Sequence, residues 1–398
     1  MRHIEIIPSK SDAHRALICA ALSDLTSGRA CQVVCSSTSQ DIEATAKCLA
    51  ALETGRSQMY CGESGSTLRF LLPVMGALGY RAEFYPEGRL PERPLSPLYE
   101  ELESHGCRLS PQGSVPFVIE GQLKPGFFHI PGDVSSQYIS GLLFALPLLE
   151  EESRIVIEGE LQSRPYVEMT IRVLRDFGIE ILPVEDGYRV PGGQRYGAPP
   201  VYQVEGDWSN GCFWLAAGAL VPGGVCVSGL NPDSLQGDKE ILRLLSRFGA
   251  RIEASAEGIA VMPDTLCGIE IDASQIPDMV PILAVIACGA KGKTTIKNAG
   301  RLRIKESDRL ASVSQVLAGL GADITELAEG LEILGTGRLA GGTADSWGDH
   351  RIAMMAAIAS LICDGPVTIT GSQAVKKSYP DFFRILEEAG LGENIERK

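Results

Sequence analysis

The sequence predicts an α/β protein with two domains, and three observations lead to this expectation. The chain has 398 residues, more than one hydrophobic core ordinarily serves. Hydrophobic residues make up 44% and charged residues 22%, which is the balance of a globular protein. A polar turn followed by an apolar helix recurs six times, with a period of about 70 residues and a shorter first unit.

Each of the six units opens with a polar turn, and the helix that follows is apolar on nearly every side. The units start at Ser9, Gly62, Gly132, Gly206, Ile276 and Gly348. A helix without a polar face belongs in a core, so we expect all six helices to be buried.

Short β-branched runs and a second, amphipathic helix complete the units. Examples of the strands lie at 154–159, 224–229 and 366–371, and examples of the second helices at 238–248, 307–320 and 379–389. The second helices carry one charged face, which should lie outside. Glycines stand where helix C-caps belong, at Gly249, Gly321 and Gly390.

Six units suggest two domains of three units each, divided near Gly206. We expect an N-terminal domain at 9–205 and a C-terminal domain at 206–398. Residues 2–8 read as a strand without a unit of its own, so residues 1–8 are expected to join the C-terminal domain.

Charge and cysteine usage exclude several classes of protein. The formal charge is -14, so the chain should repel nucleic acid and anionic lipid. No apolar run reaches the roughly 20 residues of a membrane span, and the N-terminus lacks the apolar region of a signal peptide. The eleven cysteines form no CxxC pair, which favours reduced thiols in the cytoplasm. The five histidines are scattered, so no metal site is expected.

The turns before the buried helices suit anionic ligands. A helix N-terminus presents free N–H groups and a partial positive charge, and Gly and Ser dominate the starts at 62–66 and 135–137. Ordinary capping explains any single start as well. Basic residues beside the starts favour the ligand interpretation, and they include Lys10, Arg15, Arg93, Lys305, Arg309, Arg351 and Lys377.

Ten short motifs, in order along the chain, resemble those of the 5-enolpyruvylshikimate-3-phosphate synthase family. They lie at 9–11 with Arg15, and at 62–69, 92–94, 132–137, 163–166, 205–207, 276–278, 305–309, 349–351 and 377–381. The resemblance covers essentially the whole chain. It implies a two-domain inside-out α/β barrel with six βαβαββ repeats, three per domain, and an active site in the cleft between the domains.

The resemblance also implies a reaction and its site. The enolpyruvyl group of phosphoenolpyruvate would pass to the 5-hydroxyl of shikimate 3-phosphate, with release of phosphate, in aromatic amino acid biosynthesis. No cofactor is implied, and we expect a cytoplasmic monomer whose partners are these two substrates. Shikimate 3-phosphate would bind Lys10, Ser11, Arg15, Ser135, Ser136, Gln137, Ser163, Tyr166, Asp278 and Lys305. Phosphoenolpyruvate would bind Lys10, Gly65, Arg93, Gln137, Arg309, Arg351 and Lys377.

The implied chemistry needs a base for the hydroxyl proton and an acid for the methylene carbon. We assign Asp278 as the base and Glu306 as the acid, with Lys10 as an alternative source of the carbon proton. Glu306 would need a raised pKa, which the neighbouring lysines oppose. Asp278 could also serve as a helix N-cap.

The sequence departs from the family pattern at three places. Glu63 and Arg301 stand where asparagine is common, and residues 11–15 read Ser-Asp-Ala-His-Arg. The Lys-Ser-x-x-x-Arg frame is intact, so the departures concern ligand affinity more than the reaction.

Two other functions remain open at this point. The sister enolpyruvyl transferase that acts on UDP-N-acetylglucosamine shares the fold but not the motifs at 10–15 and 349–351, and it typically uses a loop cysteine, which the segment 85–96 lacks. A non-catalytic clamp around nucleic acid would need basic inner helix faces, but these helices are apolar and the chain is acidic.

Overall fold

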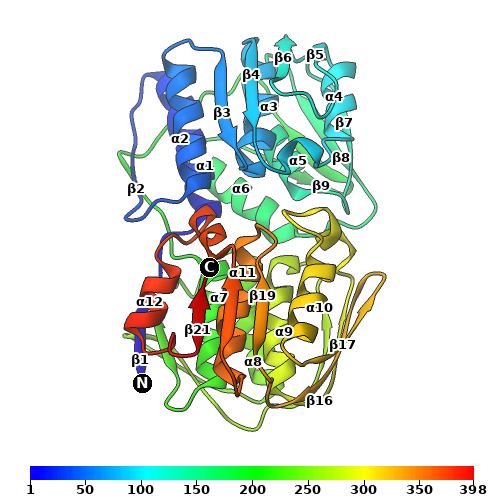
Figure 1. The fold of residues 1–398 in the computed structure, drawn as a ribbon. Coiled ribbons are helices and arrows are strands. Elements are labelled where there is room, and N and C mark those ends of the chain that lie inside the picture. Colours follow the sequence, from blue (N-terminus) through cyan, green and yellow to red (C-terminus); the bar gives the residue numbers. More distant parts are fainter. The chain divides into compact units, whose positions relative to one another are not determined.

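The computed structural model describes residues 1–398 and forms an α/β fold of two compact units (Figure 1). One unit comprises residues 10–204, and the other comprises residues 1–9 with 205–398. Each junction lies one residue from the expected position. Ser9 and Glu205 belong to the second unit because the Ser9 amide donates to the Glu205 carbonyl (2.7 Å) and both side chains bond to Gln236.

The unit of residues 10–204 contains six helices and ten strands. The helices are α1 (Lys10–Ser27), α2 (Gln40–Glu53), α3 (Gly65–Leu78), α4 (Leu98–Ser104), α5 (Ser136–Ala145) and α6 (Arg164–Asp176). The strands are β2 (Gln32–Val34), β3 (Gln58–Gly62), β4 (Ala82–Pro86), β5 (Cys107–Leu109), β6 (Phe117–Gly121), β7 (Phe127–Pro131), β8 (Ser153–Glu158), β9 (Leu182–Val184), β10 (Gly187–Val190) and β11 (Val201–Gln203).

The second unit contains six helices and eleven strands. The helices are α7 (Trp208–Leu220), α8 (Ile241–Phe248), α9 (Val280–Gly289), α10 (Arg309–Gly319), α11 (His350–Ala359) and α12 (Phe382–Glu388). The strands are β1 (Arg2–Glu5), β12 (Val225–Ser228), β13 (Arg251–Ser255), β14 (Gly258–Met262), β15 (Glu270–Asp272), β16 (Lys291–Lys297), β17 (Asp323–Leu327), β18 (Gly330–Thr336), β19 (Gly342–Asp345), β20 (Val367–Thr370) and β21 (Ile395–Arg397).

Four sheets share one strand order, in which two parallel strands are followed by an antiparallel pair. The orders are β3-β4-β6-β5, β7-β8-β10-β9, β1-β12-β14-β13 and β15-β16-β18-β17. Two shorter sheets, β11-β2 and β19-β20-β21, contain only parallel pairs. Strand β1 pairs with β12, Arg2 opposite Val225, which confirms that the N-terminal strand joins the C-terminal half.

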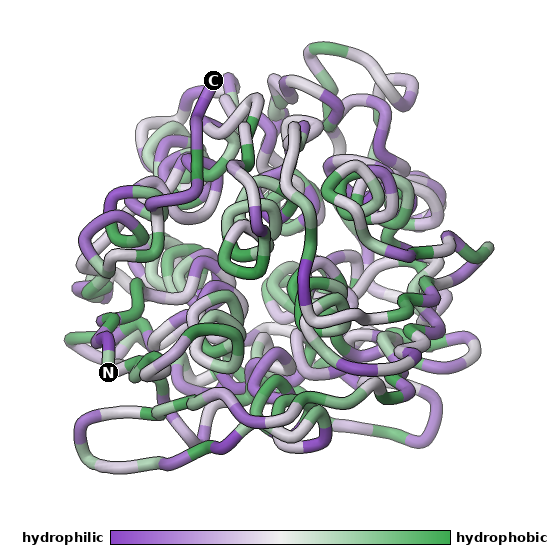
Figure 2. The backbone as a smooth tube through the Cα atoms, turned by 60° about the horizontal axis from the view of Figure 1, so that its bottom comes forward, coloured by the Kyte–Doolittle hydropathy of each residue, from purple (hydrophilic) through white to green (hydrophobic).

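The six apolar helices are present and buried, as predicted. They are α1, α3, α5, α7, α9 and α11. Each unit has its own hydrophobic core, and in the second unit Trp208 and Trp214 of α7 are fully buried. In Figure 2, where several helices are seen end-on, green hydrophobic residues lie along these helices together with more polar ones. None of the helices combines the length and the apolar content that crossing a membrane demands.

The second helices start later than predicted. A 3-10 turn at Gly237–Glu240 precedes α8. Helix α10 begins at Arg309 because Asp308 has an extended backbone and its side chain accepts a hydrogen bond from the Ala311 amide. Gly249 ends α8 in the left-handed conformation (φ 114°), as its predicted C-cap role requires.

Helices α3 and α5 pack so closely that their backbones nearly touch, and the missing side chain of Gly141 in α5 makes this possible. A Cβ at Gly141 would lie 2.3 Å from the carbonyl oxygen of Arg69 in α3. We expect Gly141→Ala to lower the free energy of unfolding by about 1–3 kcal/mol, because the helices must move apart. Urea denaturation would measure this loss.

A second helical glycine provides the control for Gly141. Gly319 of α10 has only the Thr343 carbonyl oxygen within reach of an added Cβ, at 3.8 Å. Gly319→Ala should therefore be neutral or stabilising by up to about 1 kcal/mol. Equal effects of the two substitutions would refute the close packing of α3 on α5.

Candidate functional site

In the second unit, a buried guanidinium joins three carboxylates from distant parts of the sequence. Arg309, the first residue of α10, is 1% exposed. Its Nη1 donates to Asp278 Oδ1, its Nη2 to Glu306 Oε2 and its Nε to Asp349 Oδ2, each at 2.7 Å. Asp349 also caps α11, accepting a hydrogen bond from the Arg351 amide. The three ion pairs hold the starts of α9, α10 and α11 together.

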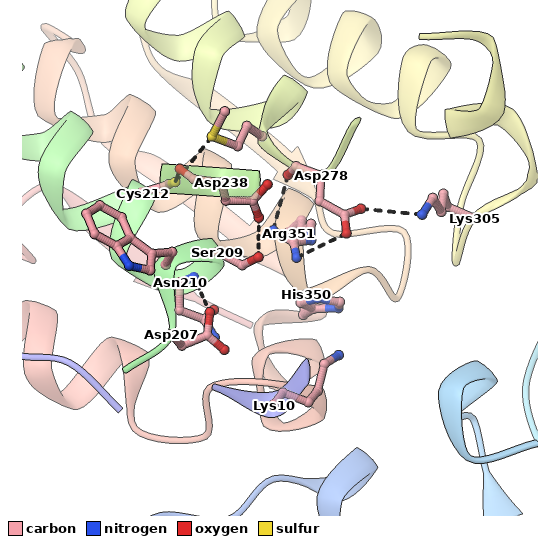
Figure 3. A network of polar contacts seen from close by, with 12 residues as sticks. Lys10, Asp207, Ser209, Asn210, Cys212, Asp238, Asp278, Lys305, His350 and Arg351 are labelled. Carbon is pink, nitrogen blue, oxygen red and sulfur yellow. Dashed lines mark hydrogen bonds and ion pairs between the residues drawn. The ribbon is translucent and has the colours of Figure 1, made fainter. Parts of the chain in front are cut away.

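Asp278 lies between several cations. Lys305 Nζ is 3.5 Å from its Oδ1, and Arg351 Nη2 is 3.5 Å from its Oδ2 (Figure 3). Burial would raise the pKa of the Asp278 carboxyl, but Arg351, Lys305 and Arg309 together hold it well below its ordinary value. The carboxylate is therefore ionised at neutral pH.

The capping role considered for Asp278 is not observed. Asp278 sits inside the 3-10 turn Pro277–Met279 that leads into α9. Neither this turn nor α9 has a side-chain cap at its N-terminus. The Asp278 side chain instead faces the three cations.

Lys305 titrates near neutral pH in this setting. Burial lowers the pKa of its ammonium group to about 8, although Asp278 opposes the shift. Arg309 and Arg301 lower the pKa of Lys305 further. Arg301, which stands where asparagine is common in the family, therefore affects the protonation of Lys305. A bound anion would favour the charged form.

Asp238 is a buried carboxylate whose place in the sequence predicted only the start of a helix. It is fully buried in the turn before α8 and accepts a hydrogen bond from Ser209. Burial raises the pKa of its carboxyl to about 6, while Arg351 opposes the shift and Asp278 adds to it. Its sequence context, a Gly-Asp pair before an amphipathic helix, gives no sign of this environment.

Lys377 lies at the end of the 3-10 segment Ser372–Lys377 and is buried. That segment packs against α11, the helix whose first turn carries Arg351. The second unit thus brings five predicted ligand or catalytic residues into one region. Lys377 lies on the segment that packs against α11, next to this region. The five are Asp278, Lys305, Glu306, Arg309 and Arg351.

In the unit of residues 10–204, the first two turns of α1 carry Lys10 and Arg15. Lys10 Nζ pairs with Asp41 Oδ2 of α2 at 2.8 Å. Arg15 donates from Nη1 to the Ser11 carbonyl (2.6 Å) and from Nη2 to the Tyr166 carbonyl (2.9 Å). Burial lowers the pKa of the Arg15 guanidinium to about 10. Arg15 therefore ties the first turn of α1 to the start of α6, next to the predicted ligands Ser11 and Tyr166.

Two guanidinium groups meet above the first residue of α3. A Cβ at Gly65 would lie 2.7 Å from Arg69 Nη1 and 3.0 Å from Arg93 Nη1, so only glycine fits without displacing them. Arg69 Nη1 donates to Gln137 Oε1 (2.9 Å), and Gln137 Nε2 donates to Ser66 Oγ (2.9 Å). Two guanidinium groups at a helix N-terminus suit a carboxylate or a phosphate.

Arg69 was not among the predicted ligands, although its position carried a signal. It follows Gly65 by four residues, which is one helical turn and places both on one face of α3. Glu63, the acidic departure in the same turn, directs its carboxyl group toward Gly88, where an added Cβ would lie 2.7 Å from it.

The predicted serines lie at helix starts and differ in their roles. Ser135 caps α5, accepting a hydrogen bond from the Gln137 amide (3.3 Å), and Ser136 is the first residue of that helix. Ser163 precedes α6 without a side-chain cap and has φ 53°, an uncommon conformation for a residue with a side chain. Backbone strain of this kind often accompanies ligand sites.

Together, the repeated α/β fold and these buried clusters of Lys, Arg and carboxylate define an α/β enzyme suited to small anionic ligands. The arrangement offers several guanidinium groups, the N-termini of several helices and the ionised Asp278 carboxylate among cations.

Comparison with known proteins identifies the family. The family model described as EPSP synthase (3-phosphoshikimate 1-carboxyvinyltransferase) matches residues 52–386. The 3-phosphoshikimate 1-carboxyvinyltransferase of Clostridium kluyveri is 43% identical over 412 residues, which covers 97% of this chain and 94% of that protein. The enzyme of the same name from Clostridium acetobutylicum is 43% identical over 414 residues, with coverage of 97% and 94%.

Solved structures agree with this result. The EPSP synthase of Acinetobacter baumannii superposes with a TM-score of 0.78 at 25% identity, covering 98% of this chain and 96% of that one. The enolpyruvyl transferase NikO from Streptomyces tendae has a TM-score of 0.77 at 18% identity, with coverage of 98% and 95%, and shares the fold. The chain belongs to the EPSP synthase family, and it is a transferase of the enolpyruvyl class.

Proposed function

We propose that this enzyme transfers the enolpyruvyl group of phosphoenolpyruvate to the 5-hydroxyl of shikimate 3-phosphate and releases phosphate. The family and its named relatives support the substrates. The observation that carries the residue assignment is the ionised Asp278 carboxylate among Arg309, Arg351 and Lys305.

We assign Asp278 as the base that receives the hydroxyl proton. The hydroxyl oxygen then bonds to C2 of phosphoenolpyruvate, and the methylene carbon takes a proton from Glu306 or Lys10 to become a methyl group. The ion pair of Glu306 with Arg309 (2.7 Å) opposes protonation of Glu306, so this carboxyl must take up a proton before it can act as the acid. The C–O bond to phosphate then breaks while one methyl proton returns to the acid that supplied it, which restores the double bond. The hydroxyl proton taken by Asp278 leaves with the phosphate, so atoms and charges balance. No metal or organic cofactor is assigned a role.

The depressed pKa of Asp278 has a mechanistic consequence. A carboxylate held far below its ordinary pKa by three cations is a weak base. Anionic groups of the substrates would pair with Arg351 and Lys305 and offset their effect on Asp278. Substrate binding would thereby raise the basicity of Asp278 at the moment when it is needed.

The remaining ligand assignments follow the family resemblance. Geometry supports them most directly at Gly65, Arg93 and Gln137, where the start of α3 and two guanidinium groups converge, and we add Arg69 to this set. Arg15 keeps one N–H on each terminal nitrogen after its bonds to the protein, because a guanidinium carries five.

The fold and assembly assignments are also part of the proposal. We propose that the three repeats of each unit form an inside-out barrel, which their buried first helices support.

Both units supply proposed ligands, so ligand binding should draw the units together, and small-angle scattering would detect this closure. An unchanged radius of gyration at saturating substrate would count against closure. A cytoplasmic monomer is proposed, and the eleven free cysteines suit a reducing compartment.

The pKa of Lys305 predicts how ligand affinity depends on pH. An anion binds the charged ammonium form, which is lost as the pH rises through about 8. The dissociation constant of shikimate 3-phosphate should therefore rise about tenfold between pH 7 and pH 9. Titration calorimetry would measure it. In Lys305→Arg this rise should disappear, because arginine stays charged, and an equal rise in both proteins would rule out Lys305 as its source.

Acceptor choice tests the proposed function. Phosphate release from phosphoenolpyruvate should occur with shikimate 3-phosphate and not with UDP-N-acetylglucosamine. Release only with the nucleotide sugar would assign the enzyme to the sister activity. Release with neither acceptor would overturn the proposed reaction while leaving the family assignment in place.

A further inference from the structure

In the unit of residues 10–204, consecutive hydrogen bonds join four buried polar side chains from α1, α2 and the start of α3. We call these four residues the His14 network. His14 lies one turn after Lys10 in α1, Thr45 lies in α2, and Ser64 and Thr67 lie at the start of α3. His14 is 1% exposed and the other three are 0% exposed. None of them belongs to the ligand set proposed above.

Three short hydrogen bonds connect the network. His14 Nδ1 is 2.7 Å from Thr45 Oγ1, and Thr45 Oγ1 is 2.6 Å from Thr67 Oγ1. The Thr67 hydroxyl donates to Ser64 Oγ at 2.7 Å. Ser64 Oγ also accepts from the Thr67 amide at 3.3 Å, as the N-cap of α3.

Counting hydrogens sets the direction of these bonds. A hydroxyl carries one hydrogen, and that of Thr67 goes to Ser64. The hydrogen between Thr45 and Thr67 must therefore come from Thr45. It follows that His14 donates from Nδ1, which leaves Nε2 as a bare nitrogen, and His14 Nε2 has no hydrogen-bond partner.

The surroundings of His14 agree with a neutral ring. Burial lowers the pKa of the imidazole well below its ordinary value, and Lys10 and Arg15 lower it further. A proton on Nε2 would lack an acceptor in a buried site, which is costly. Phe70 meets the ring edge to face, with 6.5 Å between centroids.

We propose that His14, as the neutral Nδ1–H tautomer, is a positioning residue that holds the start of α3 in register with the first turn of α1. The network begins beside Lys10, and Thr45 stands in α2 one turn after Asp41, the partner of Lys10. It ends at Ser64, which directly precedes Gly65. Both ends thus adjoin residues assigned to phosphoenolpyruvate. Lys10 is assigned to both substrates and Gly65 to phosphoenolpyruvate alone, and this part of the inference rests on the proposed function.

The network should affect the two substrates unequally. The shikimate 3-phosphate residues Ser11 and Tyr166 are tied together independently through Arg15. Breaking the network should therefore raise the KM for phosphoenolpyruvate about tenfold, while the KM for shikimate 3-phosphate and kcat change less than about threefold.

The tautomer can be measured without any substrate. In the ¹⁵N-labelled full chain, imidazole shifts distinguish a protonated nitrogen from a bare one, and the signal missing from His14→Asn identifies His14. We expect a protonated Nδ1 and a bare Nε2 from pH 6 to pH 8. A protonated Nε2 or an imidazolium at pH 7 would overturn the proposal. This result is independent of whether the proposed reaction occurs.

Substitutions at Thr45 test the positioning role. Thr45→Val keeps the shape but removes the hydroxyl, and Thr45→Ser restores it, so the raised KM for phosphoenolpyruvate should return to within about twofold in the serine variant. Thr294→Val is the matched control, because Thr294 is equally buried, lies in β16 of the other unit and accepts only a 3.4 Å bond from the Ile269 amide.

Two results would contradict the role. One is an unchanged KM for phosphoenolpyruvate in Thr45→Val, and the other is an equal loss in Thr45→Val and Thr45→Ser. If Thr45→Val does not fold, His14→Asn against His14→Leu gives the same comparison, because only the asparagine amide can donate to Thr45. A wild-type enzyme without activity would instead overturn the proposed function. The ¹⁵N measurement of the His14 tautomer would still show whether the His14 network is correct.

Discussion

Asp278→Asn should lower kcat by about 10²- to 10⁴-fold, the usual contribution of a general base. The amide has the shape of the carboxylate but cannot accept the hydroxyl proton. Because the substitution also removes a negative charge between Arg309, Arg351 and Lys305, the KM values of the anionic substrates should stay level or fall. Steady-state phosphate release would separate kcat from KM.

Asp272→Asn is the matched control for Asp278. Asp272 ends β15 in the same unit and is exposed, and its hydrogen bonds go to Ser274 and Asn298. Its substitution should leave kcat within about twofold. A kcat for Asp278→Asn close to that of the control would remove Asp278 from the role of base.

Arg309→Met should lower the free energy of unfolding by about 3–5 kcal/mol, because it leaves three carboxylates close together without their shared cation. Asp349 is fully buried, and Asp278 and Glu306 expose less than a fifth of their side chains. The midpoint of thermal unfolding should fall by roughly 6–20 °C for a unit of this size. Differential scanning calorimetry would measure the shift.

Arg303→Met provides the comparison for this loss. Arg303 also pairs with two carboxylates, Asp308 and Glu326, but about a third of its side chain is exposed to solvent. Surface pairs contribute about 0–1 kcal/mol, so its loss should be small. Similar losses in the two variants would show that Arg309 does not hold the helix starts together.

Much of the fold could be predicted from local sequence. The six apolar helices and the polar turns before them follow from composition and periodicity alone. The place of β1 in the C-terminal half followed from a strand left without a unit, whereas its partner β12 is seen only in the structure. The starts of the second helices were less predictable, because the extended backbone of Asp308 decides where α10 begins.

The candidate site was predicted less completely, for physical reasons. The ligand set came from family resemblance, whereas the grouping of Asp278, Glu306 and Asp349 around Arg309 depends on helices that meet only in the fold. The environment of Asp238 also arises from tertiary burial. Local spacing could have identified Arg69, one helical turn after Gly65.

Deuterium incorporation tests the central claim most directly, since the proposed mechanism protonates the methylene carbon of phosphoenolpyruvate. The reaction would run in D₂O with shikimate 3-phosphate, and mass spectrometry of the enolpyruvyl product would locate the label. We expect deuterium in the vinylic CH₂ group, because the methyl group loses only one of its three hydrogens when the double bond returns. A product without deuterium in that group would contradict the account, because the enolpyruvyl group would then have moved without protonation of its carbon.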